Sequence, residues 1–397
     1  MSLVEDAAAL QDDLVALRRE LHQIPEVGLE LPRTRERVLA ALDGLPLEVS
    51  TGSALSSVTA VLRGGRPGPA VLLRGDMDAL PVTERTGLPF TSRHDGAMHA
   101  CGHDLHTAGL VGAARLLAAR REELAGDVVF MFQPGEEGWD GAGHMIREGV
   151  LDAAGRPLAA AYGLHVFSAL FPAGRFVCRP GTMMAASDAL LVRVHGSGGH
   201  GSMPHRALDP VPAACEMVTA LQTMVTRSID VFDPVVVTVG TFHAGTRRNV
   251  IPDEAVFEAT VRTFSEAARA RVRDAAVRVC REIAAAHGLR ADVEYADEYP
   301  ATVNDPAEYD LVADTVREVF GEDRFAPMEN PLPGSEDFSR VLREVPGAYV
   351  FLGACLSGEP ESAPNNHSPL AAFDDRVLAD GAALLAELAV RRLNRAD

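Results

Sequence analysis

The sequence predicts an α/β protein in which a smaller α+β domain is inserted into a larger α/β domain. The chain has 397 residues, and a single hydrophobic core stops growing at roughly 250–300 residues. Apolar runs typical of buried strands alternate with helical patterns in both terminal parts of the chain. Between them the order of elements changes. We therefore place the larger domain at residues 1–185 and 299–397 and the inserted domain at residues 186–298.

Composition describes an ordinary soluble globular protein, with 47% hydrophobic and 23% charged residues. The formal net charge of −19 argues against nucleic acid or an anionic membrane surface as a partner. No apolar run approaches the roughly 18 residues of a membrane span, and the acidic N-terminus lacks the features of a secretory signal. The 5 cysteines are odd in number and dispersed, which is typical of a reducing compartment. We expect a cytoplasmic protein.

The larger domain begins with two helices and two strands. Leucines at helical spacing, with charged residues between them, predict an amphipathic helix over residues 3–22. Proline at a first turn predicts a second helix over 32–42. The apolar runs 57–62 and 70–74 are separated by GGRPGP and predict strands on either side of a turn.

A helix is expected next, over residues 104–124, because its apolar residues recur at helical spacing and its arginines lie on the other face. Asp104 stands in the first turn of this helix, where a carboxylate can cap free N–H groups. The apolar runs that follow predict strands at 128–132, 160–166 and 174–184.

The inserted domain is predicted from its order of elements. A strand, a helix, two strands, a helix and a strand are expected at 188–195, 207–229, 235–242, 254–263, 265–287 and 291–296. This βαββαβ order is the ferredoxin-like pattern, a layer of helices on a sheet. From Pro300 the larger domain resumes, with a helix at 307–320, a strand at 348–352 and a closing helix at 375–394.

Several predicted strands of the larger domain end in side chains that can bind metal or move protons. Asp76 and Asp78 follow one buried strand, the pair Glu136 and Glu137 follows another, and His165 ends a third. Open α/β sheets place their sites at the carboxyl ends of strands. A turn cap is the alternative for the Asp pair and a solvated acidic loop for the Glu pair. The repeated placement of acids after strands favours a site.

Two further segments carry candidate metal ligands. The stretch MHACGHDLHTA, residues 98–108, brings Cys101, His103 and His106 to the entry of a helix, and thiolate and imidazole suit zinc, manganese, cobalt or nickel. A buried cysteine among hydrogen-bonded core histidines is the alternative. His367 lies in the loop APNNHSP, whose polar residues favour an exposed position over a core one. A plain surface histidine is the alternative there.

Together these segments supply a mixed sulfur, nitrogen and oxygen ligand set that can hold two divalent cations: Cys101, His103, Glu137, His165 and His367. Two such metals polarise a carbonyl oxygen and lower the pKa of a shared water to about 7. Glu136, beside Glu137 but outside this set, would take the proton from that water and later deliver it to a departing amine. We find no phosphate-binding loop and no Gly-x-Ser-x-Gly elbow, so no organic cofactor or serine nucleophile is expected.

Short motifs over nearly the whole chain carry a family resemblance: LHQIPE (21–26), RGDMDALPV (74–82), MHACGHDLHTA (98–108), FQPGEEG (132–138), GLHV (163–166), GSGGHGSMPH (196–205), NVIP (249–252), TVND (302–305), SEDF (335–338) and NHSP (366–369). The chain resembles the metal-dependent aminoacylase and carboxypeptidase superfamily, in its N-acyl-amino-acid amidohydrolase branch with hippurate hydrolases and plant auxin-conjugate hydrolases. The resemblance implies a di-metal catalytic α/β domain at residues 1–185 and 299–397 and an inserted ferredoxin-like lid or dimerisation domain at 186–298.

The resemblance also implies roles for individual residues. The metal ligands would be Cys101, His103, Glu137, His165 and His367. Glu136 would be the catalytic base, and Asp78 would position a ligand or the base. His200 matches a lid histidine that, in relatives, reaches the partner subunit's site and stabilises the oxyanion. Asn249 and Arg262 match lid residues that grip the substrate carboxylate. A turn histidine and a solvated strand arginine are the alternatives for His200 and Arg262.

Three positions need separate comment. Asp76-Met77-Asp78 stands where much of the superfamily has His-x-Asp, so the expected ligand set is that of the cysteine-containing branch, and Asp76 receives no role. Gly135 stands where relatives often have alanine, a small change. Trp139 follows the Glu pair, where it either lines an acyl pocket or packs ordinarily; packing is favoured.

We therefore predict a metal-dependent amidohydrolase that cleaves N-acyl amino acids into a carboxylic acid and a free amino acid. It would hold two divalent metal ions, zinc, manganese, cobalt or nickel, and form a homodimer or homotetramer. A dipeptidase or carboxypeptidase is the nearest alternative, because the same centre hydrolyses either bond. A non-catalytic binding protein descended from such an enzyme is disfavoured, because both the base and the full ligand set are present.

Overall fold

The chain folds around two main sheets, one in each of its two units. The computed structural model describes residues 2–395. Its first unit comprises Met1–Met183, Val303–Asn330 and Asp337–Asp397, and its second comprises Met184–Thr302 with Pro331–Glu336. The two strands at the junctions, β7 (Gly181–Met184) and β14 (Thr302–Asn304), pair with each other. Within residues 2–395, no helix combines the length and apolar character that a membrane span requires.

The first unit is built on an eight-stranded mixed sheet of order β1-β2-β4-β3-β5-β16-β6-β15. Its strands are β1 (Leu47–Thr51), β2 (Val58–Leu62), β3 (Arg66–Asp76), β4 (Ala125–Gln133), β5 (Leu158–Phe167), β6 (Phe176–Cys178), β15 (Phe325–Pro327) and β16 (Gly347–Gly353). The central strands β4, β3, β5 and β16 run parallel and consist mostly of buried residues. This burial on both faces explains why their sequences are continuous apolar runs.

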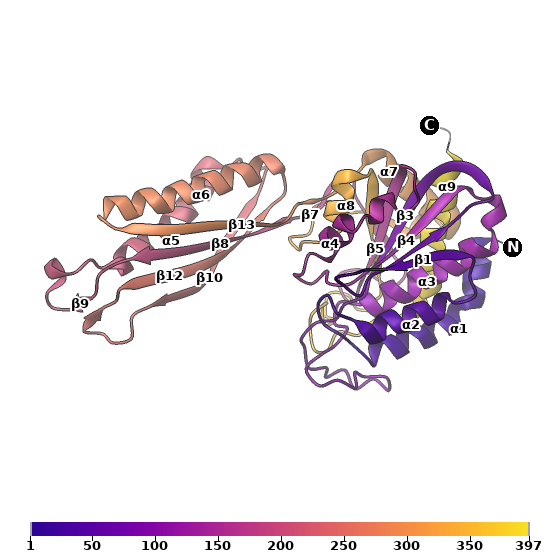
Figure 1. Ribbon diagram of the computed structural model, residues 1–397, viewed down its shortest axis with the longest axis horizontal. Coiled ribbons are helices and arrows are strands. Elements are labelled where there is room, and N and C mark those ends of the chain that lie inside the picture. The colour runs from indigo at the N-terminus through magenta and orange to yellow at the C-terminus, as the bar shows by residue number, and fades with distance from the viewer. Residues whose placement is uncertain (1, 396–397) are drawn as a thin grey trace. The chain divides into compact units, whose positions relative to one another are not determined.

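Helices pack on this sheet (Figure 1). They are α1 (Leu3–His22), α2 (Pro32–Leu42), α3 (His103–Ala119), α4 (Gly141–Arg147), α7 (Pro306–Phe320), α8 (Ser339–Glu344) and α9 (Leu378–Asn394), with 3-10 turns at Arg121–Glu123, Val150–Asp152, Glu322–Arg324 and Asp375–Val377. Helices α1, α3 and α9 pack against one another, and α3 and α9 both contact β3. The resulting core buries Leu14, Leu117, Phe130 and Leu384 completely. Helix α3 is therefore held on both sides by apolar packing.

The start of α3 differs from the sequence expectation in one respect. Asp104 does not cap the helix: the N-cap is Gly102, in a left-handed conformation, and no side chain caps the end. The Asp104 carboxylate instead lies 2.7 Å from Nε of Arg18 and 2.8 Å from Nδ1 of His22. Both partners come from α1. Because Asp104 is fully buried, its charge requires a cationic partner, and that requirement outweighs capping.

The second unit has a four-stranded antiparallel sheet of order β10-β12-β8-β13, with two helices. Its elements are β8 (Ala186–His195), α5 (Pro210–Ser228), β10 (Val235–Ala244), β12 (Glu254–Thr263), α6 (Glu266–Ala286) and β13 (Arg290–Tyr299), besides a 3-10 turn at Pro204–Arg206 and a small sheet of β9 (Gly199–His200) and β11 (Val250–Ile251). Buried residues alternate along β8 and β12, so one sheet face packs on the helices. The predicted α/β fold with a βαββαβ insertion is confirmed.

Candidate metal centre

The centre forms where three central strands of the first unit end. Asp76 is the last residue of β3 and pairs with Gln133, the last residue of β4. Two residues earlier in β3, Arg74 pairs with Gly163 of β5, so His165 reaches the same edge of the sheet. The turn after β4 carries Glu136 and Glu137. Parallel strands thus deliver acidic and imidazole side chains to one edge, as the order of the sheet requires.

The five predicted metal ligands lie together. Cys101 Sγ is 3.4 Å from His165 Nε2 and 3.3 Å from His367 Nε2. His367 Nε2 is also 3.2 Å from Glu137 Oε1, and His103 Nε2 is 4.0 Å from the same oxygen. In the sets Cys101, His103, His165 and Cys101, Glu137, His367, the donor atoms all lie within 4.8 Å of one another. The two sets share the thiol sulfur, so they form one continuous cluster.

The chemistry of this cluster fits divalent cations. Neither ring nitrogen of the buried His103 has a hydrogen-bond partner within residues 2–395, and an unpaired buried imidazole is unfavourable. Burial, more than its neighbours, lowers the pKa of His165 well below its ordinary value, which keeps this imidazole in the neutral form that binds metal. Burial and then the charge of Glu137 raise the pKa of Cys101. A cation beside the sulfur would act in the opposite direction.

Asp78 organises the turn that carries the two glutamates. Its Oδ1 accepts the backbone N–H of Glu136 at 3.0 Å, and its Oδ2 accepts that of Glu137 at 3.1 Å. Oδ1 also lies 3.4 Å from Nδ1 of His103. The Glu136 carboxylate is 7% exposed, and its Oε2 lies 4.0 Å from Nε2 of His103. One aspartate therefore touches both the turn of the candidate base and a candidate ligand.

Sequence reasoning left the role of Asp76 open and left His106, a candidate ligand, out of the five-residue ligand set, and the structure places both against the cluster. His106 Nδ1 lies 2.5 Å from Asp76 Oδ1, and His106 Nε2 accepts the backbone N–H of Val166 at 2.8 Å. Burial opposes ionisation of Asp76, but the charges of Arg74 and His103 outweigh it and hold the pKa of Asp76 well below its ordinary value. With both nitrogens occupied, His106 supports the site from one helical turn beyond His103. The three-residue spacing of His103 and His106, which places both on one face of a helix, was the signal in the sequence that could have predicted this.

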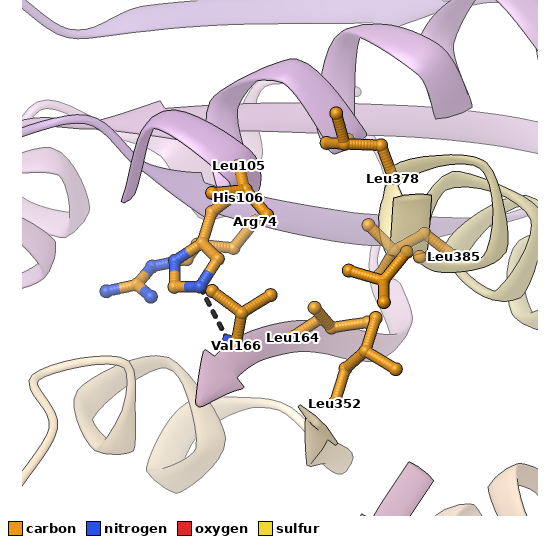
Figure 2. Close-up of a pocket in the computed structure, with 11 residues that line it drawn as sticks. Arg74, Leu105, His106, Leu164, Val166, Leu352, Leu378 and Leu385 are labelled. Atoms are coloured by element: carbon orange, nitrogen blue, oxygen red, sulfur yellow. Dashed lines mark hydrogen bonds between the residues drawn. The ribbon is translucent and has the colours of Figure 1, made fainter. Parts of the chain in front are cut away.

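A small cavity adjoins His106 on the side of the core (Figure 2). Its volume is about 20 Å³, and five of its eleven lining residues are leucines, from α3, β5, β16 and α9. Figure 2 shows His106 at one end of the cavity, joined to Val166 by their hydrogen bond. A volume of this size admits about one water molecule. The cavity is therefore a packing defect behind the centre and is too small for a substrate.

Within the second unit, His200 and Asn249 are neighbours. His200 of β9 pairs with Val250 of β11, and Gly201 N–H donates to the Asn249 carbonyl at 2.9 Å. The Ser202 backbone N–H donates to His200 Nδ1 at 3.2 Å, and the Ser202 hydroxyl lies 2.7 Å from the same nitrogen. A backbone N–H only donates, so Nδ1 is unprotonated and the neutral ring carries its proton on Nε2.

Arg262 is not brought close to His200 by the fold of this unit. Arg262 pairs with Ser187 near the start of β8, whereas His200 follows the end of β8. The Arg262 guanidinium hydrogen-bonds the Ser187 hydroxyl. The three predicted substrate-contacting residues of the second unit thus occupy two ends of its sheet.

The chain is similar to known proteins over most of its length. A family model for peptidase family M20/M25/M40 matches residues 72–391. Three similar proteins are thermostable carboxypeptidase 1 of Saccharolobus solfataricus (38% identical, covering 100% of both chains), N-acetyl-L-cysteine deacetylase of Bacillus subtilis (36%, covering 98% of this chain and 90% of the relative) and hippurate hydrolase of Campylobacter jejuni (34%, covering 99% and 100%).

Solved structures of similar proteins superimpose on this chain over nearly its whole length. A proposed aminohydrolase of methicillin-resistant Staphylococcus aureus superimposes with a TM-score of 0.92 at 34% identity, covering 99% of each chain. A dinuclear metal-binding peptidase of the M20 family from Bacillus subtilis superimposes with a TM-score of 0.83 at 33% identity, covering 97% of this chain and 99% of that chain. The first unit of the present chain carries groups of side chains of the kind that hold metal ions.

Proposed function

This chain belongs to peptidase family M20/M25/M40, and from that premise we propose that it is a metal-dependent hydrolase of the amide bond in N-acyl amino acids. The products are a carboxylic acid and a free amino acid. One observation supports the proposal: five side chains of types that can bind metal converge from four separate segments, with the Glu136 carboxylate beside them. A purely structural cluster would hydrogen-bond its buried imidazoles. The ring nitrogens of His103 lie 3.4 Å from Asp78 and 3.5 Å from Asp76 carboxylate oxygens but form no hydrogen bond of good geometry within residues 2–395.

The residues that would hold two divalent ions are Cys101, His103, Glu137, His165 and His367. Zinc, manganese, cobalt and nickel all suit this sulfur, nitrogen and oxygen set. When bound, such ions polarise the amide carbonyl and acidify water. The sulfur, nitrogen and oxygen donors of these five residues set the affinity of the site for the metal ions.

The remaining steps fall to side chains of this chain. Glu136 takes a proton from the attacking water and transfers it to the nitrogen of the departing amino acid. Asp78 keeps Glu136 in place through the backbone N–H groups of the turn. His200, with its proton on Nε2, donates to the oxyanion in the partner subunit's site. Asn249 and Arg262 bind the substrate carboxylate, and because they lie at opposite ends of the second unit's sheet, we assign them to different subunits of the dimer.

We also propose a domain division, an oligomeric state and a cellular compartment for the chain. Residues 1–185 and 299–397 form the catalytic domain, and residues 186–298 form the lid or dimerisation domain. The chain works as a homodimer or homotetramer in the cytoplasm on small N-acyl amino acids, without nucleic acid or membrane partners. The net charge of −19 supports the last point, because anionic polymers and anionic surfaces repel it.

The test is a substrate panel on protein loaded with each of the four metals. Glu136→Gln keeps the shape of the side chain but removes the base, so hydrolysis should fall by about 10²–10⁴-fold while metal content stays unchanged. Glu361→Gln, on an exposed residue of the same unit, is the matched control and should keep full activity. Wild-type protein that binds metal and hydrolyses no N-acyl amino acid would refute the proposal, as would a fully active Glu136→Gln variant.

A second candidate function is cleavage of peptides from their carboxyl end. It is favoured by one observation, the 38% identity over the full chain to a protein named thermostable carboxypeptidase 1. The same panel separates the two functions if it includes acetyl-, benzoyl- and aminoacyl-amino acids of one C-terminal residue. Faster hydrolysis of the aminoacyl compounds, which carry a free α-amine, would identify a dipeptidase or carboxypeptidase.

A further inference from the structure

The side chain of Asn366 joins three segments of the first unit at the metal cluster. Its Nδ2 lies 3.3 Å from the Cys101 carbonyl oxygen and 3.0 Å from the Val166 carbonyl oxygen. Its Oδ1 accepts the backbone N–H of Ser168 at 2.9 Å, and the Ser168 hydroxyl lies 3.0 Å from Oδ1 and 2.9 Å from the Pro364 carbonyl oxygen. Backbone carbonyls only accept and a backbone N–H only donates, so these contacts fix which end of the amide is nitrogen.

Both carbonyl contacts of Nδ2 fall on or beside a predicted metal ligand. The Cys101 carbonyl belongs to a ligand residue, Val166 directly follows His165, and Asn366 directly precedes His367. The Nδ2 of Asn366 also lies 3.8 Å from Cys101 Sγ, within reach of an N–H to sulfur contact. One amide group therefore sets the spacing of ligands that come from three distant parts of the sequence.

The Val166 carbonyl links this amide to the orientation of His165. The same oxygen accepts from Asn366 Nδ2 and from His165 Nδ1, the latter at 2.9 Å. With its proton on Nδ1, His165 presents the lone pair of Nε2 toward Cys101 Sγ. Partners of this kind fix the tautomer and ring direction of metal-binding histidines.

The backbone of His367 also needs support. Its φ angle is +71°, in the left-handed region that non-glycine residues adopt only where their surroundings hold them. His367 N–H donates to the Ala100 carbonyl at 2.8 Å, and the Asn366 side chain anchors the preceding residue. These two contacts fix the loop so that His367 Nε2 meets Cys101 Sγ.

We propose that Asn366 is a positioning residue that sets the metal affinity of the centre, by holding Cys101, His165 and His367 at ligand spacing before any metal binds. A preformed set of ligands loses less conformational freedom on binding, so affinity rises. The proposal rests on the proposed function only for the identity of the metal ligands.

Asn366→Asp tests the proposal because it keeps the shape of the side chain. The new carboxylate oxygen faces two carbonyl oxygens and the Cys101 sulfur, so hydrogen bonds are lost and the thiolate is repelled. Loss of such outer partners typically weakens metal binding by about 10–100-fold. We expect that loss for Co²⁺, measured by competition with a chromogenic chelator, together with a shifted or weakened thiolate-to-cobalt absorption band.

Asn365→Asp is the matched control. Asn365 is the preceding residue and is exposed, and its Oδ1 accepts the Asn366 backbone N–H at 3.0 Å, a role that aspartate also fulfils. Its cobalt affinity and absorption band should equal those of the wild type. Ser168→Ala provides a second variant that folds readily. It removes a hydroxyl within hydrogen-bond distance of the amide oxygen and leaves the backbone N–H donor in place, so affinity should fall by a smaller factor than in Asn366→Asp.

The outcomes are distinct because cobalt binding needs no substrate. Wild-type cobalt affinity and an unchanged band in both Asn366→Asp and Ser168→Ala would overturn the proposal and leave the proposed function standing. Equal losses in Asn365→Asp and Asn366→Asp would also overturn it, because the effect would then belong to charge on the loop. Wild-type protein that binds no cobalt would overturn the ligand assignment, and the proposal with it.

Discussion

Replacing Asp104 by asparagine should destabilise the first unit by about 3–5 kcal/mol, the usual cost of removing one partner from a buried ion pair. Asp104 Oδ2 lies 2.7 Å from Nε of Arg18, and both side chains are 0% exposed. The same oxygen lies 2.8 Å from His22 Nδ1. Asparagine keeps the shape of the residue but leaves the guanidinium buried beside a neutral group.

The magnitude follows from how little else compensates the Arg18 charge. Its next carboxylate is Asp375, with 3.8 Å between Nη1 and Oδ2, and its remaining cation contact is the Phe90 ring, 4.8 Å from Cζ to the centroid. Burial alone would raise the pKa of Asp104, but the charges of Arg18 and His22 outweigh burial and hold that pKa well below its ordinary value. The Asp104 carboxylate is therefore fully ionised near neutral pH, and Asp104→Asn removes one full negative charge beside Arg18.

Urea unfolding of the metal-free protein measures this loss. Trp139 is the 1 tryptophan of the chain and belongs to the first unit, so its fluorescence reports that unit alone. The midpoint of unfolding should fall with little change in slope. The matched control is Asp13→Asn, which breaks the exposed pair with Arg115, 3.5 Å apart with Asp13 72% exposed, and should cost at most about 1 kcal/mol.

A double variant separates lost charge from lost packing. Arg18→Met combined with Asp104→Leu replaces the ion pair by apolar side chains, and such replacements are often neutral or stabilising. We expect the double variant to recover most of the stability that Asp104→Asn loses. The reasoning would be refuted if the free energies of unfolding of Asp104→Asn and Asp13→Asn differed by less than about 1 kcal/mol, the size of a surface ion pair.

Three further predictions address a buried histidine, the second unit and a glycine. The Asp104 charge, against the effect of burial, raises the pKa of His22, so His22 stabilises fully below about pH 6.5. The stability difference between wild type and His22→Gln should shrink as pH rises through the folded-state pKa; a pH-independent difference in urea midpoints would contradict this. Ser202→Ala should lower kcat about fivefold, one hydrogen bond, with KM little changed and Ser202→Thr restoring it; an unchanged kcat would argue against a role for the hydroxyl in holding His200. Gly102→Ala should lower stability by about 1–3 kcal/mol, because φ is +86° and the new Cβ would clash with a methyl group of Val166; an unchanged Tm would rule out this strain.

Most strands and helices were predictable because their signals are local. Short elements, among them β1, α4 and α8, were not predicted, and the strand expected at 174–184 is two strands, β6 and β7, in different sheets. Continuous apolar runs marked β3, β4 and β5, and the βαββαβ order of the inserted segment appeared in the spacing of its elements. Family membership was also readable, because it rests on short motifs kept in order. The role of Asp104 was mispredicted, since its position in a first helical turn is a local cue for capping.

The partners of buried charges were not predictable in the same way. Nothing near Asp104 in the sequence indicates that α1 brings Arg18 and His22 against it. The same holds for Asp76 and His106, whose hydrogen bond depends on α3 packing on β3. Contacts between residues distant in sequence are set by how whole elements pack, and periodicity within one element carries no record of that packing.

The sequence by itself determined the fold class, the family and the residue types available for metal-dependent hydrolysis, because periodicity and motifs are properties of neighbouring residues. The five-residue ligand set stays a prediction, but only the tertiary structure decided that its donor atoms come within reach of one another. It alone decided that Asn366 spans three ligand segments. The physical reason is that metal coordination and hydrogen bonding act over a few ångströms of space, and chain neighbours account for few of the atoms within that distance.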